Sequence, residues 1–257
     1  MDLTRNDNDN DNDNTDLREA EWEVRKNLAA AYRLIALYGW DDLVFTHLSA
    51  RVPGPEHHFL INPYGLLFHE ITASSLVKVD RDGEVVEAGG LQRVNPAGFT
   101  IHSAVHMGRE DAAAVMHIHA ADGVAVSAHK DGLLPLSQTA MLCLDHLCYH
   151  EYEGVALNLD ERERLIEDLG NKSMMMLRNH GILTAGTSVA EAFTYLYFLM
   201  KACQIQVKAQ SCGSVHLPSK QAITTTAEQS QTLGKAAALT WPALIRYLDA
   251  ENPGYAV

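Results

Sequence analysis

The chain has 257 residues, 47% of them hydrophobic and 21% charged, so it can bury a large core as a globular protein. A formal net charge of −13 argues against nucleic acid as a partner, because no basic surface is available to neutralise phosphates. No apolar run reaches the length of a membrane span, and the polar start predicts no signal peptide. None of the four cysteines forms a Cys-x-x-Cys pair, so we expect a reducing, cytoplasmic location.

The first residues are dominated by Asn and Asp, which alternate strictly over residues 6–14. These residues favour local turns, and the run contains nothing apolar to bury. We therefore expect residues 1–15 to form a disordered Asn/Asp tail and residues 16–257 to form a single domain. A helix is predicted from Asp16, as its cap, to Gly39, where glycine ends it.

Strand and helix patterns then alternate irregularly along the chain. Runs rich in β-branched residues predict strands at 44–52, 58–61, 76–79, 84–87, 115–117, 142–148, 174–177 and 182–184. Capping residues and helical periodicity predict helices at 97–109, 120–129, 160–169, 188–210 and within 227–248, the last interrupted at Pro242. This mixture, with a hairpin at 76–87, predicts a mixed sheet with helices on both faces.

A His-x-His motif ends the strand predicted around residues 114–118. Side chains alternate along a strand, so His117 and His119 point the same way. A third histidine, His180, follows the apolar run 174–177. Three imidazoles of this kind suit one divalent ion, with zinc the first choice and manganese or iron(II) the alternatives. Two strand-end histidines that merely satisfy their polar groups are the competing interpretation.

Four spaced motifs resemble the class II aldolase/adducin family. They are Asn95-Pro96-Ala97-Gly98 with Ile101-His102-Ser103-Ala104-Val105-His106, then Arg109-Glu110-Asp111, then Val115-x-His117-x-His119-Ala120, then Asn179-His180-Gly181 with Gly186. The resemblance spans about residues 20–210. It implies a three-layer α-β-α sandwich with a central mixed, mainly antiparallel sheet. It also implies a tetramer with sites between subunits, and zinc held by His117, His119 and His180.

The sequence differs from the aldolases of that family at the residues for proton transfer and for phosphate binding. Gly98 stands where they carry the glutamate that transfers a proton. His47 replaces an asparagine of their phosphate-binding turn, and Pro96 and Ala97 replace serines. The chain therefore resembles the adducin-like branch, in which bacterial members include metal-dependent decarboxylases and oxygenases, whereas adducin itself is a cytoskeletal protein without the metal histidines.

The resemblance also implies further residues of the site. His47 is a candidate catalytic residue, although a strand histidine bonded to the backbone explains it equally well. Gln138 is a second candidate, expected near a neighbouring subunit's site, and an ordinary loop amide is its alternative. Tyr64 and Gly65 occupy the position of the family's substrate loop.

The lost acid leaves several replacements open. Glu70 and the pair Asp145-His146 are candidates, and the spacing does not choose between them. His102 and His106 lie one helical turn apart and can form a second metal pair. The simpler expectation is that His102 packs in the core and His106 lies on the surface.

These features predict a metal-dependent lyase that decarboxylates or cleaves a small oxo or hydroxy carboxylate. Decarboxylation requires an electron sink but no initial base, which agrees with Gly98. A mononuclear non-haem iron oxygenase on the same three histidines is one alternative. An adducin-like, actin-linked protein with a vestigial site is the other. The apolar residues of helix 188–210 further predict a homotetramer.

Overall fold

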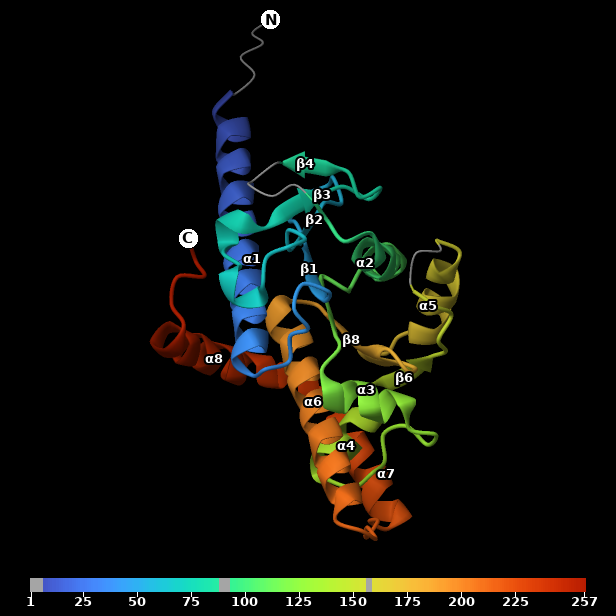
Figure 1. Cartoon of the computed structure of the whole chain (residues 1–257). Helices are drawn as coiled ribbons and strands as arrows, with labels where there is room; N and C mark the ends of the chain where they lie inside the picture. Colours follow the sequence, from blue (N-terminus) through green and yellow to red (C-terminus); the bar gives the residue numbers. More distant parts are fainter. Residues whose placement is uncertain (1–6, 88–92, 156–158) are drawn as a thin grey trace, which may run out of the picture.

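The computed structural model describes residues 7–87, 93–155 and 159–257. Its centre is an eight-stranded sheet in the order β4-β3-β2-β1-β5-β8-β7-β6. Every pair of neighbours is antiparallel except β6 and β7, which run parallel. Helices cover both faces, α1 and α6 on one side and α2 and α5 on the other (Figure 1). The expected α-β-α sandwich with a mixed, mainly antiparallel sheet is thus confirmed.

The strands are short and most lie within the predicted runs. Their bounds are β1 His47–Arg51, β2 Phe59–Ile61, β3 Val77–Val79, β4 Val85–Glu87, β5 Ala114–Ile118, β6 Leu147–His150, β7 Met174–Leu177 and β8 Gly181–Gly186. The helices are α1 Asp7–Leu37, α2 Pro96–Gly108, α3 Ala121–Ala128, α4 Gln138–Leu144, α5 Glu161–Leu169, α6 Val189–Ser211, α7 Lys220–Gln229 and α8 Ala237–Glu251. Three short 3₁₀ segments are η1 Phe68–Glu70, η2 Ala73–Ser75 and η3 Ser230–Ala236.

Alternation along the central strands divides the core into two layers. Met116 and Ile118 of β5 face the cluster that contains the buried side of α1 and α6. Val115, between Ala114 and Met116, faces the opposite cluster with α2 and α5. His117 therefore points to the α2 face, and its cross-strand partner on β1 is His47.

Three local predictions are wrong. Helix α1 begins at Asp7 rather than Asp16 and takes in most of the Asn/Asp run, because adding turns to an existing helix avoids the cost of nucleation. Residues 142–144 belong to α4, and only the end of the predicted strand 142–148 is extended, as part of β6. The C-terminal interruption is η3, whereas Pro242 lies inside an unbroken α8.

Helix α6 begins as predicted, because the Ser188 hydroxyl accepts a hydrogen bond from the Glu191 N–H. Most of its large apolar side chains are buried within the chain itself, among them Phe193, Leu196 and Leu199. Half-buried Tyr197 and Phe198 remain, and they line a hollow of about 390 Å³ with Tyr38, Leu244 and Tyr247, among others. The apolar surface that motivated a tetramer is therefore smaller than the sequence suggested.

Candidate metal centre

The structure brings His117, His119 and His180 together at one end of the sheet. His117 lies on β5 and His119 follows one residue beyond its end, so both point the same way. His180 comes from the turn between β7 and β8 and reaches them because β8 pairs with β5. Two segments more than 60 residues apart thus supply one cluster.

The turn that carries His180 has a conformation that its neighbours make possible. Asn179 has φ of 56°, in the left-handed region that Asn tolerates better than most residues. A Cβ at Gly181 would lie 2.5 Å from the Ile118 carbonyl oxygen and 3.1 Å from the His119 ring. Glycine at this position therefore lets β8 pass closely enough to bring His180 beside the His-x-His pair.

The three Nε2 atoms converge. His119 Nε2 lies 2.9 Å from both His117 Nε2 and His180 Nε2. The possible ligand atoms of the three residues all lie within 4.8 Å of one another. This spacing allows all three to bind a single ion at the usual metal–nitrogen distance of about 2.0–2.1 Å.

The outer nitrogens of two rings are already engaged. His117 Nδ1 lies 3.0 Å from the Ile182 carbonyl oxygen, which can only accept a hydrogen bond. His119 Nδ1 lies 3.1 Å from the Asp42 carboxylate. With a proton on each Nδ1, both Nε2 lone pairs face each other, an arrangement that a cation between them stabilises. The donor set therefore fits a divalent metal.

Burial and mutual repulsion keep the cluster in the form that binds metal. Burial, with the neighbouring imidazoles adding to it, holds the pKa of His117 well below its ordinary value. The same causes, with burial the larger, lower the pKa of His180 to about 4. Neutral imidazole is the ligand form of histidine, so no proton has to be displaced near neutral pH at these two residues.

The cluster opens into a cavity of about 460 Å³. The predicted residues His47 and Tyr64 line it, and Gly65 follows directly with φ of 115°. The lining also includes Asn95 and Ile101 from the quoted family motif, and residues that the sequence did not single out: Asp42, Phe45, Tyr152, Gly154 and Val155. Asp42 precedes His119 by 77 residues, so no sequence spacing links the two.

His47 occupies the space above Gly98. A Cβ added at Gly98 would lie 2.4 Å from His47 Cδ2 and 2.7 Å from His47 Nε2. The ring centroid of His47 is 5.2 Å from that of His117. The His47 ring therefore fills the space that a side chain at position 98 would need, so the two positions depend on each other for packing.

The expectation that His106 lies on the surface is wrong. His102 and His106 are both buried, and both contact the Ser49 hydroxyl. They do not form a second metal pair, because the Ser49 hydroxyl lies between His102 Nδ1 and His106 Nε2 and bonds to both. The Ser49 hydroxyl and the Arg51 guanidinium of β1 bond to α2, at His102 and at the His106 carbonyl oxygen, and neither residue lines the cavity.

The other sequence candidates lie elsewhere. Glu70 bonds to the Leu67 N–H, and His146 Nε2 lies 3.0 Å from the Ser230 carbonyl oxygen. Neither they nor Asp145 are among the residues that line the cavity within the described part of the chain. Gln138 is exposed at the first turn of α4, outside the lining of this cavity. Its predicted role in a neighbouring subunit's site stays a prediction.

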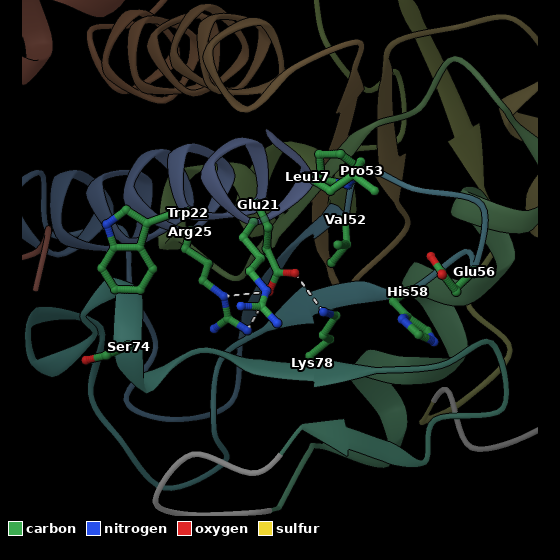
Figure 2. A pocket seen from close by; sticks show the side chains of 11 residues that line it. Leu17, Glu21, Trp22, Arg25, Val52, Pro53, Glu56, His58, Ser74 and Lys78 are labelled. Carbon is green, nitrogen blue, oxygen red and sulfur yellow. Dashed lines mark hydrogen bonds and ion pairs between the residues drawn. The ribbon is translucent and has the colours of Figure 1, made fainter. Parts of the chain in front are cut away.

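A larger hollow, of about 790 Å³, lies beside the middle of α1 and is not lined by His117, His119 or His180 (Figure 2). Its central charged side chains are engaged with one another, since Glu21 bridges Arg25 at 2.8 Å and Lys78 at 2.6 Å. None of the predicted site residues lines it. Size alone does not identify the site, and convergent ligand atoms do.

Comparison with known proteins identifies the family of this chain. The family described as "Class II Aldolase and Adducin N-terminal domain" matches residues 26–207 of this chain. The chain therefore belongs to the class II aldolase and adducin family. A crystal structure of an aldolase II superfamily protein from Pseudomonas syringae has a TM-score of 0.90 and 53% identity, and covers 93% of this chain and 96% of its own.

Other relatives point to different functions. A Caulobacter vibrioides protein whose name carries only a provisional class 2 aldolase assignment is 57% identical over 93% of both chains. The L-fuculose 1-phosphate aldolase of Glaciozyma antarctica has 29% identity and a TM-score of 0.80, covering 92% of this chain and 93% of its own. Alpha-adducin of Rattus norvegicus is 48% identical over 72% of this chain, but this region is only 25% of adducin.

Proposed function

We propose that the chain is a metal-dependent lyase that decarboxylates or cleaves a small oxo or hydroxy carboxylate. The observation that carries the proposal is the convergence of three Nε2 atoms, two of them oriented by hydrogen bonds on the far side of the ring. His117, His119 and His180 would hold the ion, with zinc the first choice and manganese or iron(II) possible.

The chemistry of the bound ion is that of a Lewis acid, which stabilises negative charge on substrate oxygen as a C–C bond breaks. The chain's own groups then position the substrate. His47 faces the same cavity and can accept a proton from a substrate hydroxyl at Nε2, so it is the proposed catalytic residue. Tyr64 lines the cavity and is proposed to contribute to substrate binding, and Gly65, which follows it in the chain outside that lining, is proposed to shape the same loop.

The structure supports a carboxylate or carbonyl substrate over a sugar phosphate. In the region that corresponds to the aldolase phosphate turn, the Ser49 hydroxyl is buried against two histidines. The Arg51 guanidinium bonds to the His106 carbonyl oxygen and lies over the Phe59 ring. Neither group lines the cavity, so neither is placed to bind a phosphate there.

Two other functions stay open for the same site. An iron oxygenase would use the same three histidines with iron(II) and O₂. A non-enzymatic, adducin-like role is favoured by the 48% identity to alpha-adducin. The proposed lyase is distinguished from both by a bound metal without oxygen reactivity and by turnover of a carboxylate.

The test begins with metal analysis of protein purified without added metal. We expect about one divalent ion per chain, and its loss in His180→Ala. His216→Ala, an exposed histidine outside the cavity, is the matched control and should keep the ion. Anaerobic addition of iron(II) and nitric oxide detects an oxygenase by its visible absorbance. Protein without metal and without turnover of 2-oxo or 2-hydroxy acids would leave the adducin-like role.

A homotetramer belongs to the same proposal. One apolar surface that can take part in it is the hollow formed by Tyr38, Tyr197, Phe198, Leu244 and Tyr247 with its neighbours. Sedimentation at micromolar concentration should give a species of four chains. A monomer of 28.3 kDa would contradict both the tetramer and a site completed by a neighbour.

No helix within residues 7–87, 93–155 and 159–257 is long and apolar enough to cross a membrane. The four cysteines are free, as a chain stabilised by its core rather than by disulfides predicts. The proposed partner of the cavity is a small molecule with a carboxylate or carbonyl group.

A further inference from the structure

A continuous row of buried hydrogen bonds runs from the cavity into the α2 layer. His47 Nδ1 lies 2.8 Å from His102 Nε2, and His102 Nδ1 lies 2.5 Å from Ser49 Oγ. Ser49 Oγ lies 2.7 Å from His106 Nε2. His106 Nδ1 lies 2.9 Å from the Ala112 carbonyl oxygen, where the row ends. All four side chains are at most 3% exposed.

The end of the row fixes the direction of every bond in it. A carbonyl oxygen only accepts, so His106 carries its proton on Nδ1 and accepts from the Ser49 hydroxyl at Nε2. The Ser49 oxygen then accepts from His102 Nδ1–H, and His102 Nε2 accepts from His47 Nδ1–H. A neutral His47 must consequently leave Nε2 without a proton.

Burial keeps the histidines of the row neutral, so each ring carries one proton and the bond directions are fixed. It lowers the pKa of His106 to about 3 and holds the pKa of His102 well below its ordinary value. The far end is different in kind, because His47 lines the cavity and the described residues offer its Nε2 no hydrogen bond. The Nε2 lone pair is therefore available to a ligand.

We propose that His102, Ser49 and His106 are positioning residues that hold His47 in one tautomer, so that its Nε2 accepts a hydrogen bond from a hydroxyl group of the substrate. This inference rests on the proposed function and narrows its substrate class. A 2-hydroxy acid can donate to this lone pair. A 2-oxo acid presents only carbonyl oxygens there, which the lone pair repels.

The test uses the variant His106→Phe. Phenylalanine preserves the ring that stacks on Phe59 at a centroid distance of 4.5 Å but removes both hydrogen-bonding nitrogens. The Ser49 hydroxyl then loses its acceptor and donates to His102 Nδ1. His102 donates in turn from Nε2 to His47 Nδ1, which moves the His47 proton to Nε2. A substitution at His106, which is separated from His47 by Ser49 and His102, should thus reverse the tautomer of His47.

Nitrogen-15 NMR of histidine-labelled protein measures the tautomer directly, and His47→Gln assigns the signals by removing them. We expect a non-protonated Nε2 in the wild type and a protonated Nε2 in His106→Phe. Ser49→Ala is the second variant should His106→Phe fail to fold, and it should give a mixture because the hydroxyl bridge is absent. Ser103→Ala is the matched control, since Ser103 is a buried serine of α2 whose hydroxyl bonds to Thr100 outside the row.

Binding of lactate and pyruvate to the zinc-loaded protein tests the substrate class. We expect the wild type to prefer lactate by about tenfold, the size of one neutral hydrogen bond kept or lost, and His106→Phe to lose or reverse that preference. Ser103→Ala should retain it.

The NMR and binding results test the role of the hydrogen-bonded row separately from the proposed lyase function. A protonated Nε2 in the wild type, or an unchanged tautomer in His106→Phe, would overturn the inference. A preference for pyruvate in the wild type would also overturn it. Protein that carries the stated tautomer but binds neither metal nor acid would contradict the proposed function and still confirm the role of the row, because the NMR measurement needs no ligand.

Discussion

Replacing Gly98 by alanine tests the packing that separates this chain from the sugar-phosphate aldolases it resembles. The added Cβ would lie 2.4 Å from His47 Cδ2, closer than real Cβ contacts allow. His47 cannot swing away freely, because its Nδ1 is held by His102 at 2.8 Å. Overpacking of a rigid buried site costs about 1–3 kcal/mol, and a helical Gly→Ala change alone would instead stabilise by about 0.5–1 kcal/mol.

The net cost is then up to about 2.5 kcal/mol, so the melting temperature of Gly98→Ala should fall by several degrees, up to about 10 °C, in thermal unfolding. Gly123→Ala is the control, since Gly123 is also a buried helical glycine but its Cβ would lie 3.3 Å from the flexible Met200 sulfur. In a His47→Ala background the Gly98→Ala change should become neutral or stabilising, which a double-mutant cycle reports. A Gly98→Ala variant as stable as the wild type, or one equally destabilised in the His47→Ala background, would contradict a clash between Gly98→Ala and the His47 ring.

Three further predictions concern acid stability, the N-terminus and sugar phosphates. Since burial lowers the pKa of His106 to about 3, the unfolded chain binds this proton first as the pH falls below about 6.5. The free energy of unfolding should fall with pH between about 6.5 and 3, and His106→Phe should reduce that slope by about 1.4 kcal/mol per pH unit in denaturant titrations; an equal slope would contradict the shift. Deleting residues 1–14 should leave the melting temperature and the metal content unchanged, and a fall of several degrees would show that the first turns of α1 are docked. Without the aldolase glutamate, aldehyde release from fuculose or ribulose phosphates with zinc present should be slower by about 10²–10⁴ than the common range of roughly 1–10³ per second. Gly98→Glu should not restore it, because the His47 ring fills the space; wild-type turnover within that range would place the chain with the sugar-phosphate aldolases.

Much of the fold was predictable because its signals are local. Alternation and β-branched content identified the central strands, and Ser188 with Glu191 identified the start of α6 within one residue. The predictions failed where local signals are weak or where an established element extends past them. Helix α1 grows through the Asn/Asp run as an extension of a formed helix, and residues 142–144 have no period that separates strand from helix.

The amino-acid sequence was enough to predict which residue types form the candidate site. The His-x-His spacing and the His-Gly pair were sufficient to name three histidines and expect them together, because strand alternation requires the first two to share a face. It also showed that Gly98 lacks the aldolase carboxyl group. It could not show what replaces that group, since nothing in the spacing connects Gly98 with His47.

The side-chain contacts across the sheet became visible only in the folded structure. The pairing of β1 with β5 places His47 opposite His117, and the packing of α2 on that face places Gly98 under the His47 ring. The same packing buries His106, which we expected on the surface, and joins it through Ser49, His102 and His47 to the cavity. These relations are non-local: they depend on strand register and on which helix covers which face, and the energy of burying the polar groups is recovered only when all of them meet.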